Sequence, residues 1–222
     1  MNKTFTLILA FAAIFISSCK KDSKNDPASN STNSDYFPLT ANSAWKYLVT
    51  GAGGSDTLTV KLIGAATIIE GKTYYNTNSM YQKMGGSVGY FFRQNHLYGS
   101  NSSNATAGLT IEFEFLNDTT AAGHSWISLP TVNGLVNSVP ARTVNTIKEV
   151  NISKTVGGKI FTNVIHAEVD LQYNYGGGYE SSAVYEFYFA KGVGMIENST
   201  IISGNIYEKE RIISYDISPI LM

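Results

Sequence analysis

Apolar and polar residues alternate along much of this chain, and this period of two restricts the fold more than any other feature. The alternation recurs in the segments 57–62, 111–115, 165–171, 185–189 and 213–217. Successive side chains of a β-strand point to opposite faces, so each segment predicts a strand with one apolar and one polar face. In the last segment we expect Ile213, Tyr215 and Ile217 to share the apolar face. Strands of this kind are typical of antiparallel sheets that pack on one side.

Glycine-rich turns separate these segments. Turn glycines occur at residues 71, 85–86, 157–158 and 176–178. Glycine supplies the positive φ that tight hairpins require. No stretch after residue 35 keeps a 3.6-residue apolar period for three turns. We therefore predict an all-β fold with almost no helix, built as an antiparallel, strongly curved sheet that forms an open half-barrel or a sandwich.

The predicted β region contains two stretches of similar pattern. Each begins with a tryptophan after small residues, Trp45 and Trp126, and these are the only tryptophans in the chain. Each then continues into a glycine-lysine hairpin and an aromatic run. Because β-hairpins resemble one another by default, two interpretations stay open. The halves 36–105 and 106–222 are either a duplication or unrelated sets of hairpins in one domain.

The N-terminal residues form a separate unit with a basic start, an apolar run at 4–16 and two serines before Cys19. The apolar run is shorter than the roughly 20 residues that cross a bilayer. Its length, its basic start and the small residues after it are typical of a secretory signal peptide, which we place at 1–18. Cys19 is the only cysteine of the chain, so the folded part has no intramolecular disulfide.

The sequence Ile16-Ser17-Ser18-Cys19 resembles the lipobox of bacterial lipoproteins. The resemblance implies cleavage just before Cys19, which then carries a diacylglyceryl thioether and an N-acyl chain such as palmitate. Several acyl chains hold a protein durably on a membrane, since each buried methylene contributes about 0.8 kcal/mol. The alternative is an ordinary signal peptide followed by a chance cysteine.

The segment 19–35 contains no apolar residue larger than alanine after its cysteine. Such a composition cannot bury enough surface to offset the entropy of ordering, so we predict a disordered tether that leads into a β domain at 36–222. The Cys-Lys-Lys-Asp start resembles lipoproteins of the Bacteroidetes, which implies the outer membrane. In that group an acidic cluster after the cysteine can direct the protein to the cell surface. Only Asp22 lies near Cys19, so the periplasmic and cell-surface faces both stay open.

Two aromatic motifs carry a second resemblance. Residues 36–39 (YFPL), running into Trp45, and residues 189–195 (FAKGVGM) resemble segments of uncharacterised β-rich Bacteroidetes lipoproteins. The resemblance extends over most of the β region. It implies the fold and a cell-envelope location, and it implies no activity.

The charge of the chain is nearly balanced. It has 16 Lys and Arg against 17 Asp and Glu, a formal net charge of −1 at pH 7, with both signs interspersed. A nucleic-acid-binding protein needs a basic stripe or patch, and none is visible. We therefore expect no nucleic-acid partner. The partners that we do expect are the membrane, through the lipid on Cys19 that the lipobox resemblance implies, and a glycan or protein ligand.

Two sets of polar residues are candidate sites. His166, Glu168 and Asp170 share one face of a predicted strand and are donor types that metals accept. Successive side chains on that face lie roughly 6–7 Å apart, however, at the edge of reach for one ion. Glu112 and Glu114 share a face in the same way and suggest an acid–base pair of the kind that glycosidases use. For both sets we expect a solvated polar face instead.

No motif of a nucleophilic enzyme or a phosphate-binding loop is found. There is no Gly-x-Ser-x-Gly elbow, and the single cysteine is assigned to lipid. The segment 191–194 is interpreted as a bend after an aromatic strand, and His124 as part of a turn. The glycine-rich loop 173–179 carries Tyr173, Tyr175 and Tyr179, whose rings suit contact with sugar or peptide. Core packing plus a hairpin tip explains the same residues.

These observations predict no catalytic residue, no metal site and no cofactor. We expect a non-enzymatic binding or assembly component of the cell envelope, held by lipid at the outer membrane, whose ligand is unknown. Two alternatives stay open. The first is a carrier that holds an apolar ligand in the curved sheet, and the second is an enzyme that acts on extracellular glycans.

Overall fold

The computed structural model describes residues 35–64, 66–69, 71–104 and 109–219. The predicted signal peptide, Cys19 and the tether up to residue 34 lie outside these residues. Within the described ranges the chain forms fourteen strands and no helix, which confirms the all-β prediction. No helix in those ranges is long and apolar enough to cross a membrane.

The strands follow one another with short turns. They are β1 (Ala44–Gly51), β2 (Gly54–Leu62), β3 (Thr67–Ile69), β4 (Lys72–Tyr81), β5 (Gly85–Gln94), β6 (Leu97–Asn104), β7 (Leu109–Asn117), β8 (Ser125–Ser128), β9 (Leu135–Val136), β10 (Val139–Val156), β11 (Lys159–Asn174), β12 (Tyr179–Ala190), β13 (Gly194–Ile202) and β14 (Asn205–Asp216). The period-two segments of the sequence fall within β2, β7, β11, β12 and β14, the last extending just beyond its strand.

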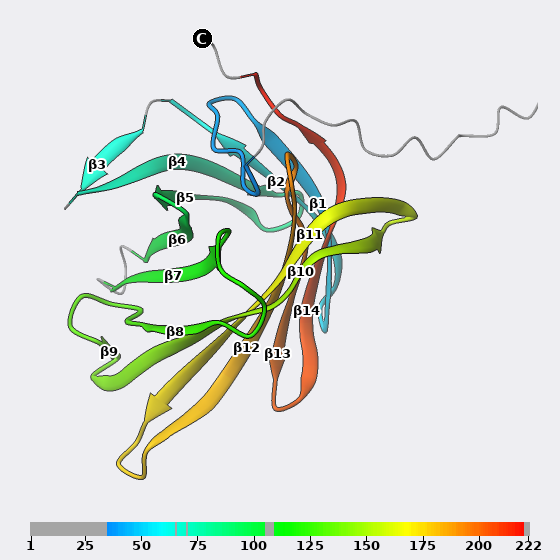
Figure 1. The fold of residues 1–222 in the computed structure, drawn as a ribbon. Coiled ribbons are helices and arrows are strands. Elements are labelled where there is room, and N and C mark those ends of the chain that lie inside the picture. The colour runs from blue at the N-terminus through cyan, green and yellow to red at the C-terminus, as the bar shows by residue number, and fades with distance from the viewer. Residues whose placement is uncertain (1–34, 65, 70, 105–108, 220–222) are drawn as a thin grey trace, which may run out of the picture.

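All strand pairs are antiparallel and belong to one curved sheet (Figure 1). Its order is β7-β6-β5-β4-β2-β1-β14-β13-β12-β11-β10-β8, with β3 added beside β4 and β9 beside β10. Neighbours in this order are close in sequence except at β1 and β14, where the first and last strands pair. The sheet is therefore a meander whose two free ends, β7 and β8, are consecutive in the chain.

The two ends of the sheet meet without a regular ladder. The Glu112 amide of β7 donates to the Pro130 carbonyl at 2.8 Å. The Trp126 indole of β8 donates to the Glu114 carboxylate at 2.9 Å. These contacts draw the ends together, while the sheet itself stays open along this seam.

Aromatic rings fill much of the space inside the curve. Phe113 and Phe115 of β7 pack against Tyr185, Phe187 and Phe189 of β12, with ring centroids 5.2–5.4 Å apart across the two strands. Aromatic pairs of this kind contribute about 0.5–1.5 kcal/mol each beyond the burial of their surface. The core thus joins strands from opposite ends of the meander, and no disulfide takes part because the chain has a single cysteine.

The alternation expected in the last strand is wrong at one position. Ile212 is buried, whereas Ile213 is exposed, and Tyr215 is packed only partly against the core. The pairing of β1 with β14 shifts register here, with Trp45 opposite Tyr215 but Tyr47 opposite Ile212. This β-bulge adds one residue to β14 and reverses its alternation.

Gly99 of β6 is required by close packing on its strand. A Cβ at this position would lie 2.2 Å from the ring of Phe92 and 2.3 Å from the Phe113 carbonyl oxygen. Phe92 is fully buried, so its ring cannot swing into solvent. We expect Gly99→Ala to lower the free energy of unfolding by about 3 kcal/mol, measured by denaturant titration.

The matched control is Gly177→Ala, at a turn where an added Cβ meets nothing within 4 Å. It should change stability by less than about 0.5 kcal/mol. Equal stabilities for the two variants would contradict the packing of Phe92 over Gly99.

Candidate functional site

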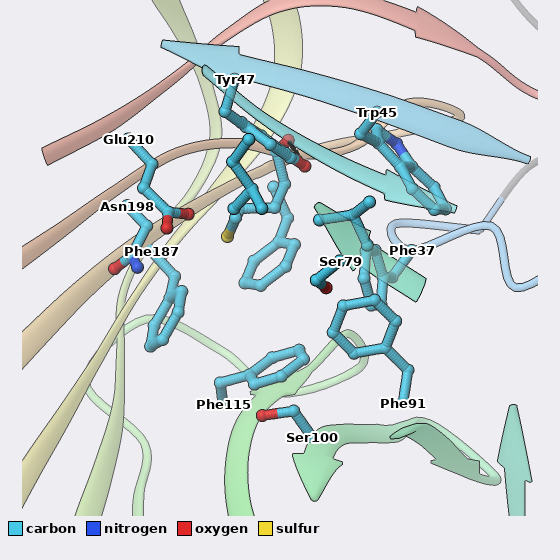
Figure 2. A pocket seen from close by; sticks show the side chains of 14 residues that line it. Phe37, Trp45, Tyr47, Ser79, Phe91, Ser100, Phe115, Phe187, Asn198 and Glu210 are labelled. Carbon is cyan, nitrogen blue, oxygen red and sulfur yellow. Dashed lines mark hydrogen bonds between the residues drawn. The ribbon is translucent and has the colours of Figure 1, made fainter. Parts of the chain in front are cut away.

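A cavity of about 200 Å³ lies inside the curve of the sheet. It is lined mainly by aromatic and aliphatic side chains, with a few polar groups: Phe37, Trp45, Tyr47, Leu58, Val60, Ser79, Phe91, Ser100, Phe115, Phe187, Phe189, Met195, Asn198 and Glu210. Figure 2 shows these side chains converging from several strands around an open centre. An apolar cavity with a few convergent polar groups is the usual form of a small-molecule site.

The aromatic walls are held by hydrogen bonds to the backbone. The Trp45 indole donates to the Val193 carbonyl at 2.6 Å, and the Tyr47 hydroxyl donates to the Met195 carbonyl at 3.0 Å. Both polar tips are thereby satisfied, as buried Tyr and Trp require. The rings can therefore present apolar surface to the cavity.

One wall of the cavity is polar. Strand pairing places Phe187 of β12 opposite Asn198 of β13, and Asn198 opposite Glu210 of β14. Figure 2 shows the Asn198 and Glu210 side chains next to each other, and the Asn198 amide favours the charged form of the carboxyl. Among the described residues, no Lys, Arg or His lies within ion-pair distance of Glu210.

The environment of Glu210 changes its acidity. Burial raises its pKa from 4.5 to about 7, because a charged carboxylate is poorly solvated there. The nearby charge of Glu208 raises the pKa further, and the hydrogen bond from Asn198 opposes both effects. Near neutral pH, Glu210 is thus present in both its neutral and its charged form.

The size of the cavity limits what it can hold. An engineered cavity of roughly 150 Å³ lined by apolar side chains binds benzene. At about 200 Å³ this cavity has room for one ring or a short alkyl chain. Among the described residues, rings of the aromatic core surround this cavity and limit its volume.

Comparison with known proteins gives similarity of fold alone. No family model matches the chain, and no curated protein matches it. A candidate exported protein with a YmcC-like fold from Bacteroides fragilis has a TM-score of 0.50 at 8% identity, covering 82% of this chain and 99% of the other. A candidate lipoprotein from Parabacteroides distasonis has a TM-score of 0.48 at 10% identity, covering 84% and 100%. The chain is therefore similar in fold to the Bacteroides fragilis protein.

The tyrosines of the predicted contact loop lie away from this cavity. The rings of Tyr173 and Tyr175 stack with centroids 6.0 Å apart, and the guanidinium of Arg142 lies 4.1 Å from the ring of Tyr179. Tyr175 is 76% exposed at the hairpin tip between β11 and β12. None of the three tyrosines lines the cavity, and their contact with a ligand stays a prediction.

His166, Glu168 and Asp170 are engaged with three different sets of neighbours. His166 contacts Glu149 at 3.0 Å and stacks on Tyr188. Glu168 pairs with a lysine at 3.3 Å, and Asp170 accepts hydrogen bonds from Gln172 and Ser181. In the described part of the chain, no group of three metal-binding side chains is arranged to hold an ion.

Glu112 and Glu114 are more enclosed than the expected solvated face. Their side chains are 19% and 16% exposed. Glu112 forms an ion pair with Lys72 and accepts a hydrogen bond from the Tyr74 hydroxyl at 2.7 Å. Glu114 is held by the indole of β8 at the seam. The pattern of β7 alone could not reveal this, because the covering residues come from other strands.

Sequence reasoning missed Glu210 and Asn198 altogether. Glu210 lies in the run Glu208-Lys209-Glu210-Arg211, which is typical of an exposed strand. The only available signal was the alternation itself, which places Glu210 and Ile212 on one face. Asn198 carries no recognisable motif.

Proposed function

We propose that this protein is an exported, lipid-anchored component of the cell envelope that binds a small apolar ligand in the cavity of its curved sheet. The observation that carries the proposal is the cavity of about 200 Å³ with rings from Phe37, Trp45, Phe115 and Phe187 around it. Apolar surface exposed in such a cavity is a source of binding energy for an apolar guest.

The location rests on the N-terminal sequence and on the fold. The lipobox at Cys19 supports export and lipid attachment. The Bacteroides fragilis protein of similar fold is described as a candidate exported protein, which agrees with this location. Attachment at the outer membrane, through acyl chains on Cys19, is part of the proposal.

A second candidate function follows from Glu210. A buried carboxyl with a raised pKa, held by a second polar group in an apolar cavity, is also the environment of a catalytic acid or base. Acid–base catalysis commonly uses a second titratable group, and among the described residues that line the cavity Tyr47 is the only other one. Its hydroxyl is turned to a backbone carbonyl, and burial raises its pKa well above 10. Binding is therefore the function that this geometry supports best.

The test of binding is to fill the cavity. Ser100→Phe places a ring in the space that Ser100 borders on β6. We expect benzene to bind the wild-type protein, detected by saturation-transfer NMR and calorimetry. The variant should bind at least about tenfold more weakly, because the added ring excludes the guest.

The control variant is Ser182→Phe, at an exposed position of β12 outside the cavity. It adds the same ring and should leave benzene binding unchanged. Absence of benzene binding to the wild-type protein, or equal binding by both variants, would contradict the proposed function.

A further inference from the structure

Among the described residues that line the cavity, Glu210 is the one acidic residue, and no cation of that part of the chain pairs with it. Glu210 is 8% exposed. The neighbouring Lys209 is committed elsewhere, since its ammonium lies 3.1 Å from Glu197. A buried carboxylate without a cation is strongly unfavourable, and a positive group in the cavity would relieve that cost.

Asn198 supplies a second acceptor at the same place. Its amide favours the charged form of Glu210, while its side-chain oxygen Oδ1 is buried and without a hydrogen-bond partner among the described residues. A buried acceptor without a donor is unfavourable, because it has lost its hydrogen bonds to water. Asn198 Oδ1 thus lacks a hydrogen-bond donor and Glu210 lacks a cation among the described residues, and one group in the cavity could supply both.

We propose that the cavity is selective for a small apolar primary amine, whose ammonium group lies between the Glu210 carboxylate and Asn198 Oδ1. This inference rests on the proposed function and names the ligand class of that same site. An ammonium group has three donors and no acceptor, which matches a wall of two acceptors. The hydrocarbon part of the amine packs against the rings of Phe115 and Phe187.

Other ligand classes fit less well. A carboxylate would bring a second negative charge beside Glu210, and like charges at short distance disfavour each other. An alcohol has a single donor and no charge, so it satisfies only one of the two acceptors. The faces of the surrounding rings also attract a cation, which favours an amine further.

Selectivity should depend on pH through Glu210. The groups that face its carboxyl are Asn198 of β13, Tyr47 of β1, Tyr81 of β4 and, on its own strand, Glu208. Burial raises the pKa of both tyrosines, so they stay neutral below pH 9. An alkylammonium group titrates near 10.4. Between pH 5 and pH 8 the cavity carboxyl is therefore the group that changes charge, and amine affinity should rise over that range.

The test compares three probes of equal chain length: hexylamine, hexanol and hexanoate. Calorimetry at pH 8 should show hexylamine binding about tenfold more tightly than hexanol, and hexanoate most weakly. In Glu210→Gln the preference for hexylamine over hexanol should fall below about twofold. The control Glu208→Gln changes a carboxylate on the same strand that does not line the cavity, and it should keep the preference.

The outcomes separate the two proposals. Equal affinity for hexylamine and hexanol in the wild-type protein, tightest binding of hexanoate, or a preference that survives Glu210→Gln would each overturn the amine inference and leave the apolar site intact. Failure of all three probes, together with failure of benzene, would overturn the proposed function as well. Loss of the preference for hexylamine in Glu210→Gln, with the preference kept in Glu208→Gln, supports the inference.

Discussion

At pH 8.5, Glu210→Gln should raise the free energy of unfolding by about 3 kcal/mol more than the same substitution does at pH 4. The folded state raises the pKa of Glu210 from 4.5 to about 7, so the folded protein holds this proton more tightly than the unfolded chain. The stability that this proton contributes is complete below pH 4.5 and is lost as the pH rises through 7. Glutamine cannot ionise, so it removes that loss.

The size of the effect follows from the shift. One pKa unit corresponds to about 1.4 kcal/mol, and Glu210 is nearly fully buried, so solvent screening removes little of it. Glutamine also keeps the shape and the capacity to hydrogen-bond with Asn198. The gain should therefore appear without loss of packing.

Denaturant titrations of both proteins from pH 4 to pH 8.5 measure this prediction. The difference in free energy of unfolding should grow between pH 4.5 and pH 7 and then level off. The control Glu180→Gln changes an exposed glutamate of β12 and should follow the wild-type curve. A constant difference between Glu210→Gln and wild type at all pH values would show that Glu210 titrates normally.

The fold was predictable because its strongest determinant is local. Alternation in β2, β7, β11 and β12 assigns each strand an inner and an outer face, and the burial of Leu58, Val169 and Phe189 agrees with it. The failure at Ile213 has a non-local cause. The bulge in β14 is fixed by pairing with β1, a strand more than 150 residues earlier in the chain. Alternation within one segment carries no information about it.

The candidate site was not predictable for the same reason. The charged neighbours of Glu210 indicate an exposed strand when the sequence is taken alone. Its burial arises only when β1 and β13 flank it and the aromatic rings of β7 and β12 close the space inside the curve. The enclosure of Glu114 was not predictable either, because the Trp126 indole that covers it comes from β8, at the other end of the sheet. When strands distant in sequence enclose a polar residue, the local sequence pattern wrongly predicts that this residue is exposed to solvent.

Phe37→Ala should lower the free energy of unfolding by about 4 kcal/mol. Phe37 lies in the segment before β1 and is 2% exposed. Its ring contacts four others, with centroid distances of 5.5 Å to Trp45, 4.6 Å to Phe91, 5.9 Å to Phe115 and 5.8 Å to Phe189. These rings belong to β1, β5, β7 and β12, so one side chain joins both halves of the meander.

The same substitution should change the ligand that the cavity accepts. Phe37 lines the cavity, and its removal adds the volume of a ring to the space inside the sheet. Naphthalene should then bind more tightly to Phe37→Ala than to the wild-type protein, in calorimetry at low temperature, where the variant stays folded. Tyr175→Ala removes an exposed ring as the control and should change stability by less than about 0.5 kcal/mol. If Phe37→Ala were as stable as this control, the N-terminal segment would not be part of the core, and the cavity would lack the wall that defines its size.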